Sequence, residues 1–330
     1  MKQFLFLSSF LILQSITMGA YASPNEPRNV LELSANPVLV KALYSHTENL
    51  LSGVGSVAAN GAIANNQGNA ETQRWGADLI AAALVTNRDP STGIAVTLFG
   101  AHLQQADGSF GVQNNFQSSS FFIESWARAL LLLQQSGNPA YAPFIAKNIQ
   151  PLERAAQWYV SSGEFEKQDK KCNEFTHRCF LNASALGETA ALTGDRQLAD
   201  LAEQSAQKGL QRQFNEGFFP EKNGFDINYN AASMMFLSRY YMICPNHNVK
   251  LMIKNALRKA GEREAQVVSS NGELSFADST RTGIDQKHNG AGKKGFDTKG
   301  IINAFVFAYG ITGKQEFESI AQNIATYRGW

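Results

Sequence analysis

Apolar residues along the chain fall into two kinds of segment that alternate. Segments of the first kind are apolar on almost every face and span residues 75–86, 120–135, 182–193, 229–243 and 298–310. Segments of the second kind have one apolar face and span residues 38–51, 94–105, 141–160, 196–214, 249–268 and 315–327. A helix that is apolar all round is buried, whereas a one-sided helix packs on a core and faces water. The pattern therefore predicts inner and outer helices in alternation.

A regular series of glycines accompanies this alternation. A glycine followed two positions later by an apolar residue recurs at Gly108, Gly163, Gly217 and Gly272, in steps of 55, 54 and 55 residues, and Gly53 lies one step further back. Each glycine opens a long loop, while short turns join each inner segment to the next outer one. Such hairpins bury their apolar faces only by stacking on their neighbours. The sequence therefore predicts five stacked hairpins after one leading outer helix.

The inner segments carry almost no charge, which bears on how the hairpins stack. A linear solenoid usually keeps one solvated concave face, whereas closure into a barrel buries the inner helices. We therefore expect an all-α fold, an incomplete α/α toroid of helical hairpins, with a linear solenoid as the alternative. No linker-like stretch interrupts the repeat, so residues 23–330 are expected to form a single domain.

The first 22 residues have the features of a signal peptide. Lys2 precedes a mostly apolar run from residue 4 to 16, and Ala20-Tyr21-Ala22 has the form of a cleavage site, which places the mature N-terminus near Ser23. The alternative is a membrane anchor, but the run is shorter than the roughly 20 residues that span a bilayer. We expect a periplasmic or secreted protein without stable membrane insertion.

Charge and motif content exclude several classes of function. The 330 residues include 29 Lys and Arg against 28 Asp and Glu, and the formal net charge is +1. A chain without a cationic field is a poor partner for nucleic acid. The sequence contains no C-x-x-C and no H-E-x-x-H motif, so we expect neither a metal ion nor another cofactor.

Two of the three cysteines lie close together in a polar stretch. Cys172 and Cys179 are expected to form a disulfide, because an exported chain folds in an oxidising compartment. Cys244 ends an apolar segment and is expected to be a buried free thiol.

The long loops are expected to meet at one end of the fold, because each leads into the N-terminus of an inner helix. Positive helix ends and unpaired N–H groups at that end suit an anionic ligand. His177 lies between the two cysteines and is the candidate general base, and Tyr229 begins the next inner segment as the candidate general acid. The last loop, residues 278–299, is long enough for a functional lid.

Acidic residues near the same helix starts leave another chemistry open. Asp226 and Asp297 each follow a Gly-Phe pair, where a carboxylate would cap the coming helix. Two of Glu221, Asp226 and Asp297 could instead serve an inverting glycoside hydrolase. Glu188 lies deeper in an inner segment and must be paired or face the barrel interior.

Four short motifs follow one another between residues 170 and 240. They are Thr176-His177-Arg178, Thr193-Gly194-Asp195-Arg196, Glu216-Gly217-Phe218-Phe219-Pro220-Glu221 and Asn228-Tyr229-Asn230. Their order resembles that of the α/α-toroid polysaccharide lyases, especially the alginate lyase family. The resemblance implies an exported lyase that cleaves a uronic-acid-containing polysaccharide by β-elimination, with His177 and Tyr229 as catalytic residues. The implied partner is an anionic polysaccharide or oligosaccharide.

Two positions depart from the pattern of this family. Thr176 stands where the lyases have an asparagine before the histidine, and Lys222 is the nearest cation to the place of their arginine upstream of the tyrosine. A toroid that binds a glycan or a protein partner without catalysis is therefore a third interpretation. The candidate substrate-binding residues lie in the loops and helix starts at the predicted site: Lys222, Asn173, Asn182, Asn115, Trp75, Arg178 and Asp226.

Overall fold

The computed structural model describes residues 56–63, 68–111, 115–287 and 292–330. These residues contain no β-strand, so the described part of the chain is all-α, as predicted, and none of its helices is long and apolar enough to cross a membrane. The predicted signal peptide and the predicted outer helix at 38–51 lie outside the described residues. The helices are η1 (Ala70–Arg74), α3 (Trp75–Val85), α4 (Ser91–His102), α5 (Phe116–Gln135), η2 (Pro139–Tyr141), α6 (Ala142–Ser161), α7 (Glu164–Cys172), α8 (His177–Thr193), α9 (Arg196–Gln211), α10 (Ile227–Ile243), α11 (His247–Ala265), α12 (Thr298–Thr312) and α13 (Gln315–Tyr327).

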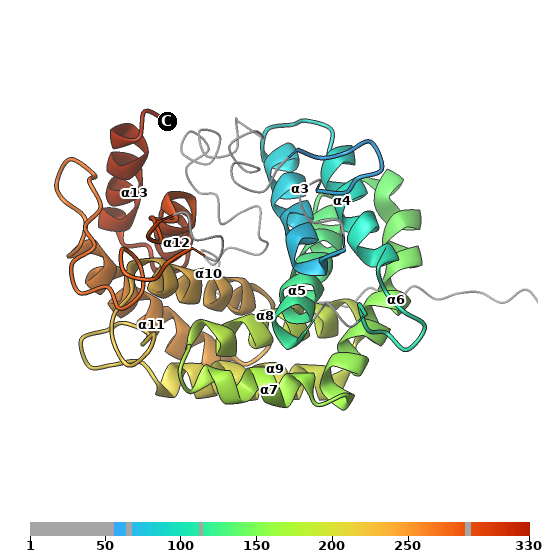
Figure 1. The fold of residues 1–330 in the computed structure, drawn as a ribbon. Coiled ribbons are helices and arrows are strands. Elements are labelled where there is room, and N and C mark those ends of the chain that lie inside the picture. The colour runs from blue at the N-terminus through green and yellow to red at the C-terminus, as the bar shows by residue number, and fades with distance from the viewer. Residues whose placement is uncertain (1–55, 64–67, 112–114, 288–291) are drawn as a thin grey trace, which may run out of the picture.

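The helices form an inner and an outer row, as the hydrophobic pattern predicts. Helices α3, α5, α8, α10 and α12 form the inner row, in which each helix packs on the next. Helices α4, α6, α9, α11 and α13 form the outer row, and each packs on the inner helix that precedes it. Figure 1 shows these hairpins following one another along an arc from α3 and α4 to α12 and α13. Buried apolar side chains between neighbouring helices form the core.

Helix α7 departs from the sequence prediction, which placed a loop after Gly163. The chain enters α7 through Gly163 in the left-handed conformation, with a φ of 83°. Glu164 and Glu166 lie in the first turn of α7, and Lys170 and Lys171 lie in its last turn. These charges complement the helix dipole at both ends, which favours a helix in a polar stretch.

The glycine series has a cause in the packing of the hairpins. Gly108, Gly217 and Gly272 have φ values of 99°, 99° and 90°, which glycine adopts at little cost. A Cβ atom at these positions would lie 2.6, 2.6 and 2.1 Å from a backbone carbonyl oxygen of the next outer helix. Only glycine therefore allows each loop to contact the following hairpin so closely. Gly163 instead opens α7, and Gly53 lies outside the described residues.

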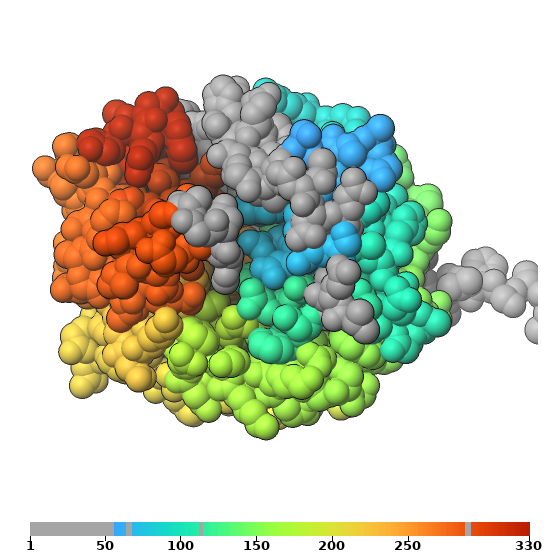
Figure 2. Space-filling view, viewed as in Figure 1, coloured from blue at the N-terminus to red at the C-terminus, as the bar shows by residue number. Residues whose placement is uncertain are grey.

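The N-terminal ends of the inner helices lie together, as the repeat predicts. A hydrogen bond or ring contact joins the start of each inner helix to the start of the next. These contacts are Glu71–Ser118, Gln117–Arg178, His177–Tyr229 and Asn228–Asp297. In the space-filling view, the residues coloured orange, which include the long loop before α12, lie across this face from the blue residues near α3 (Figure 2).

Four charged residues on three of the inner helices form a largely buried cluster. Arg128 pairs with Glu124 at 3.1 Å, as their spacing of four residues favours, and with Asp78 at 2.9 Å. Arg239 of α10 pairs with the same Glu124 carboxylate at 2.7 Å. Three inner helices are therefore joined by ion pairs within an otherwise apolar row.

Glu188 of α8 lies near this cluster but pairs with none of its cations. Its Oε1 accepts a hydrogen bond from Ser184 Oγ at 3.2 Å, and its Oε2 is buried without a hydrogen-bond partner in the described part of the chain. Burial, followed by the charge of Glu124, raises the pKa of Glu188 well above its ordinary value. Folding therefore favours the protonated form of this carboxyl group.

We predict that Glu188→Gln changes how stability depends on pH. Because the folded-state pKa is raised, the stabilisation from Glu188 is complete below the unfolded-state pKa of about 4.3 and is lost as pH rises through the folded-state pKa. The loss is at most about 1.4 kcal/mol per pH unit. Glutamine has no proton to lose, so the free energy of unfolding of the variant, measured by urea titration, should increase relative to wild type from about pH 5 to pH 8. A difference that does not change with pH would contradict the assignment.

Candidate functional site

Three loops at the N-terminal end of the inner row are bonded to one another. Thr176, before α8, donates its N–H to the carbonyl of Pro220, before α10, at 3.3 Å, and Phe175 and Glu221 form a β-bridge. Thr280, in the loop before α12, donates its hydroxyl to the carbonyl of Glu221 at 2.8 Å. The loops therefore hold the starts of α8, α10 and α12 in a fixed relation.

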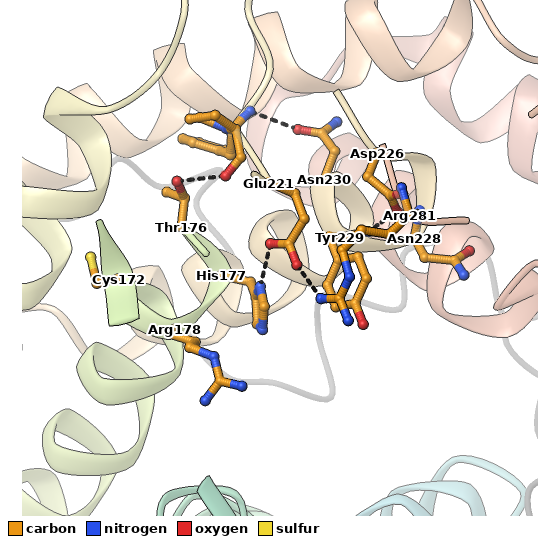
Figure 3. A network of polar contacts seen from close by, with 12 residues as sticks. Cys172, Thr176, His177, Arg178, Glu221, Asp226, Asn228, Tyr229, Asn230 and Arg281 are labelled. Atoms are coloured by element: carbon orange, nitrogen blue, oxygen red, sulfur yellow. Dashed lines mark hydrogen bonds and ion pairs between the residues drawn. The ribbon is translucent and has the colours of Figure 1, made fainter. Parts of the chain in front are cut away.

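A buried carboxylate joins these loops through its side chain. Glu221 is 1% exposed, and its Oε2 lies 3.0 Å from Nδ1 of His177, the first residue of α8. Its Oε1 accepts a hydrogen bond from Nη1 of Arg281 at 2.5 Å (Figure 3). An ionised carboxylate only accepts hydrogen bonds, so Nδ1 of His177 is the donor. The neutral imidazole is then left with Nε2 as its basic nitrogen.

Tyr229 lies beside His177 in the first turn of α10. The two ring centroids are 4.9 Å apart, and both side chains extend in the same direction in Figure 3. The guanidinium carbon of Arg281 lies 4.4 Å from the Tyr229 ring centroid, and Nζ of Lys294 donates a hydrogen bond to the Tyr229 hydroxyl. Burial raises the pKa of Tyr229 to about 12, although the charge of Arg281 opposes the shift. The phenol is therefore protonated at neutral pH and can donate a proton.

Arg281 and Lys294 bring positive charge to Tyr229 from the loop before α12. Burial disfavours the charge of Arg281, but its hydrogen bonds to Asp285, at 2.6 Å, and to Glu221 outweigh burial and raise its pKa. Burial, followed by repulsion from Arg281, lowers the pKa of Lys294. No carboxylate of the described residues lies within ion-pair distance of Lys294, so its charge is available to a ligand.

Arg178 is a second cation of this kind. It follows His177 in α8 and extends in the same direction as the His177 side chain (Figure 3). Its two terminal nitrogens donate to Oε1 of Gln168 and Oε1 of Gln117, each at 2.7 Å. Within the described ranges, no carboxylate pairs with Arg178, and burial lowers the pKa of its guanidinium.

Asp226 is a helix cap that also anchors a loop. Its Oδ1 accepts the N–H groups of Asn228 and Tyr229, which caps α10 as expected. Its Oδ2 accepts the N–H groups of Arg281 and Thr282 at 2.8 and 2.6 Å. Asp226 is completely buried, and both its oxygens are occupied. It therefore positions Tyr229 and Arg281 and does not present a free carboxylate to a substrate.

Three further predicted residues lie outside this group of side chains. Asn182 is completely buried, and its Oδ1 accepts a hydrogen bond from the Tyr159 hydroxyl at 2.8 Å, so the structure does not bring it to the site. Asn173 is exposed, and its carbonyl accepts a hydrogen bond from Arg212. Lys222 is exposed and lies 3.7 Å from Asp285, at the rim of the site.

The remaining candidates have structural contacts. Asn115 caps α5 by accepting the N–H groups of Gln117 and Ser118. Trp75 is half-buried, with the guanidinium carbon of Arg74 5.5 Å from its ring centroid. Asp297 caps α12 by accepting the N–H of Gly300 at 3.0 Å.

The predicted disulfide between Cys172 and Cys179 is confirmed, with Cα atoms 5.2 Å apart. It joins the end of α7 to the first turn of α8, next to His177. Cys244 is a buried free thiol, as expected. Thr176 donates its hydroxyl to the Pro220 carbonyl at 2.8 Å, so it serves the pairing of the two loops.

Arg281 and Lys294 are the site residues that no local sequence pattern identifies. Both lie in the loop at 278–299, whose length alone indicated a function. Their partners Glu221 and Tyr229 lie 60 and 65 residues away along the chain. These pairings could not be predicted from the sequence, because the residues come together only when the hairpins pack.

Comparisons of the chain with protein-family models, curated proteins and solved structures find no match. The site is therefore characterised by the residues and contacts of the described part of the chain. This part is an all-helical repeat protein whose inner helix starts carry a His–Glu pair, a protonated tyrosine and two cations without carboxylate partners. Together these groups provide a base, an acid and an environment for an anion.

The disulfide gives a prediction for the oxidised protein. Denatured without reductant, it should contain one titratable thiol, Cys244, because the other two cysteines are bonded. A loop this short contributes about 2 kcal/mol or somewhat more. The double variant Cys172→Ser, Cys179→Ser should lower the free energy of unfolding by about that amount in a urea titration. Three titratable thiols before reduction would refute the bond.

Proposed function

We propose that the protein is an exported polysaccharide lyase that cleaves a uronic-acid-containing polysaccharide by β-elimination, on an incomplete α/α toroid. The observation that carries this proposal is the arrangement of His177, Glu221 and Tyr229. A base and a protonated acid lie side by side at the loop end of the inner helices, with ring centroids 4.9 Å apart. Syn-elimination across one face of a sugar ring needs a base and an acid in such proximity.

His177 is the base in this mechanism. Glu221 accepts from Nδ1, which leaves the lone pair of Nε2 to take the C5 proton beside the sugar carboxylate. The C5–H bond breaks, its electron pair forms the C4–C5 double bond, and the bond from C4 to the glycosidic oxygen breaks. Glu221 also stabilises the imidazolium that results, as an orienting carboxylate does beside other catalytic histidines.

Tyr229 is the acid that protonates the leaving oxygen. With a pKa of about 12 it carries its proton throughout the neutral range. Lys294 donates to the phenol oxygen, so the phenol hydrogen is free to point toward the substrate. The nearby positive charges of Lys294 and Arg281 stabilise the phenolate left after the transfer.

The charges at the site favour an anionic substrate. Arg178 and Lys294 have no carboxylate partner among the described residues, and a sugar carboxylate would compensate the positive charge of either one. An open groove of about 1060 Å³, lined by residues that include Phe116, Trp158, Asp107 and Lys167, adjoins Arg178 through the Phe116 ring. A polymer with several sugars outside the reacting position suits such an extended surface.

An inverting hydrolase receives less support from the same geometry. That mechanism needs two carboxyl groups that are free to act on the substrate and on a water. Glu221 is occupied by His177 and Arg281, and Asp226 by four backbone N–H groups. Asp297 is a helix cap.

The disulfide supports the proposal that the protein acts outside the cytoplasm, because such bonds persist in oxidising compartments. The signal-peptide pattern at residues 1–22 points the same way. A periplasmic or secreted location would give the enzyme access to polysaccharides that do not enter the cell.

Activity is tested on a panel of uronic-acid polymers by following the ultraviolet absorbance of the unsaturated product. His177→Ala and Tyr229→Phe should each lower kcat/KM by about 10²–10⁴-fold, because each removes one general acid–base group. The matched controls are His102→Ala, on an exposed position of α4, and Tyr309→Phe, on α12, which should retain wild-type activity. If new reducing ends form without this absorbance, the protein is a hydrolase and the lyase proposal is wrong. If neither product forms on any polymer, the interpretation as a non-catalytic binding protein is supported.

A second test follows the ionisation of the acid. Because burial raises the pKa of Tyr229 to about 12, Tyr229 should contribute no tyrosinate absorbance below about pH 10. The difference in tyrosinate absorbance between the wild type and Tyr229→Phe should therefore not change with pH up to that value. A tyrosinate signal that appears near pH 8 and belongs to Tyr229 would contradict its role as the proton donor.

A further inference from the structure

The arginines on the inner helices and in the site loops differ in the chemical groups that accept their hydrogen bonds. Arg128 and Arg239 pair with Glu124, and Arg281 pairs with Glu221 and Asp285. In each of these cases a carboxylate compensates the guanidinium charge. Arg178 is bonded instead to the neutral amides of Gln117 and Gln168.

The side chain of Gln168 is held in one orientation by burial and by hydrogen bonds at both ends of its amide. It is completely buried in α7, its Oε1 accepts from Arg178 at 2.7 Å, and its Nε2 donates to Ser120 Oγ at 3.1 Å. Both ends of the amide are therefore used, and its orientation is fixed by α5. A buried amide with this pattern is a rigid support for the guanidinium.

Gln117 holds the other terminal nitrogen in a similar way. Its Oε1 accepts from Arg178 at 2.7 Å, and its Nε2 lies 3.4 Å from both carboxylate oxygens of Glu71. The amide thus stands between Arg178 and the nearest carboxylate on that side. It keeps the guanidinium in place and prevents a direct ion pair with Glu71.

An amide and a carboxylate in these positions would have different consequences. Either group fixes the guanidinium, but a carboxylate forms a charge-assisted pair that neutralises it, whereas an amide leaves its charge for a ligand. Nε of Arg178 is also buried without a hydrogen-bond partner in the described ranges. The protein therefore bears the cost of desolvating this cation without an ion pair to it among the described residues, and Glu221 and Glu71 compensate its charge only from a greater distance.

We propose that Arg178 receives the carboxylate of the substrate sugar, and that Gln117 and Gln168 are positioning residues that set the preference for acidic over neutral sugars. The inference rests on the proposed function for the kind of ligand, and it assigns the carboxylate to one side chain. The guanidinium carbon of Arg178 and the ring centroid of His177 lie 5.5 and 6.4 Å from the ring centroid of Phe175, and both side chains extend in the same direction (Figure 3), so a carboxylate held by Arg178 would lie on the side of the base that takes the adjacent proton.

The disulfide holds together the two helices that carry Gln168 and Arg178. Gln168 lies on α7 and Arg178 on α8, and the Cys172–Cys179 bond joins these two helices next to both residues. The bond therefore fixes the distance between the amide and the guanidinium that it holds.

The test measures binding and not turnover, so that it does not depend on elimination. Each variant is made in the Tyr229→Phe background, and calorimetry compares tetramers of mannuronate, guluronate and glucuronate with their carboxyl-reduced forms. Gln168→Glu keeps Arg178 in place but pairs its charge. Arg178→Gln removes the charge and is the second variant if Gln168→Glu does not fold. Gln197→Glu, on an exposed position of α9, is the control with the same change in net charge.

Gln168→Glu and Arg178→Gln should weaken binding of the acidic tetramer by about tenfold to a hundredfold, the loss expected for one charge-assisted contact. Binding of the carboxyl-reduced tetramer and the behaviour of Gln197→Glu should not change. An unchanged ratio of acidic to neutral affinity in both site variants would overturn the inference, even if the wild type proves to be a lyase. The expected ratio without any unsaturated product from the wild type would keep the inference and remove the proposed function. Failure of every acidic tetramer to bind would overturn both.

Discussion

The buried carboxylate of Glu221 is the constraint on which the arrangement of the site depends. A charge that is 1% exposed is tolerated only when it is paired and hydrogen-bonded. His177 and Arg281 supply these partners from 44 and 60 residues away, at the starts of two other hairpin units. The contact that satisfies the buried charge also sets the tautomer of His177 and holds Arg281 against the ring of Tyr229. The stability of the loop end and the chemistry of the site therefore have one common cause.

The helical repeat makes such a contact possible. Loop glycines such as Gly108 and Gly217 let each hairpin approach the next closely, so that inner helices start at a common end. Asp226 then occupies four N–H groups from two loops, which fixes the tyrosine relative to Arg281. The repeat supplies the framework, and a small number of polar contacts between loops specifies the site.

The alternation of apolar and amphipathic segments was sufficient to predict the inner and outer helices of the described residues, because burial on one face or on all faces leaves a periodic trace in the sequence. It did not predict α7, whose stretch is polar. Tyr229 could be selected because it begins a predicted inner segment, and His177 because it lies between two cysteines just before another such segment. The direction of the Asn182 side chain could not be predicted in this way. Asn182 lies five residues after His177, which turns it roughly 140° around the helix, toward Tyr159 and α6. Arg281 depends on a partner 60 residues away, and no local pattern encodes that pairing.

The central claim is that Glu221 holds His177 with its proton on Nδ1 and its lone pair on Nε2. Nitrogen NMR of the imidazole, assigned by comparison with His177→Ala, tests this claim most directly at a pH where the ring is neutral. The account predicts that Nδ1 carries the proton in the wild type and that this preference weakens in Glu221→Gln. A wild-type ring with its proton on Nε2 would contradict the account, because His177 could then not accept a proton from the substrate.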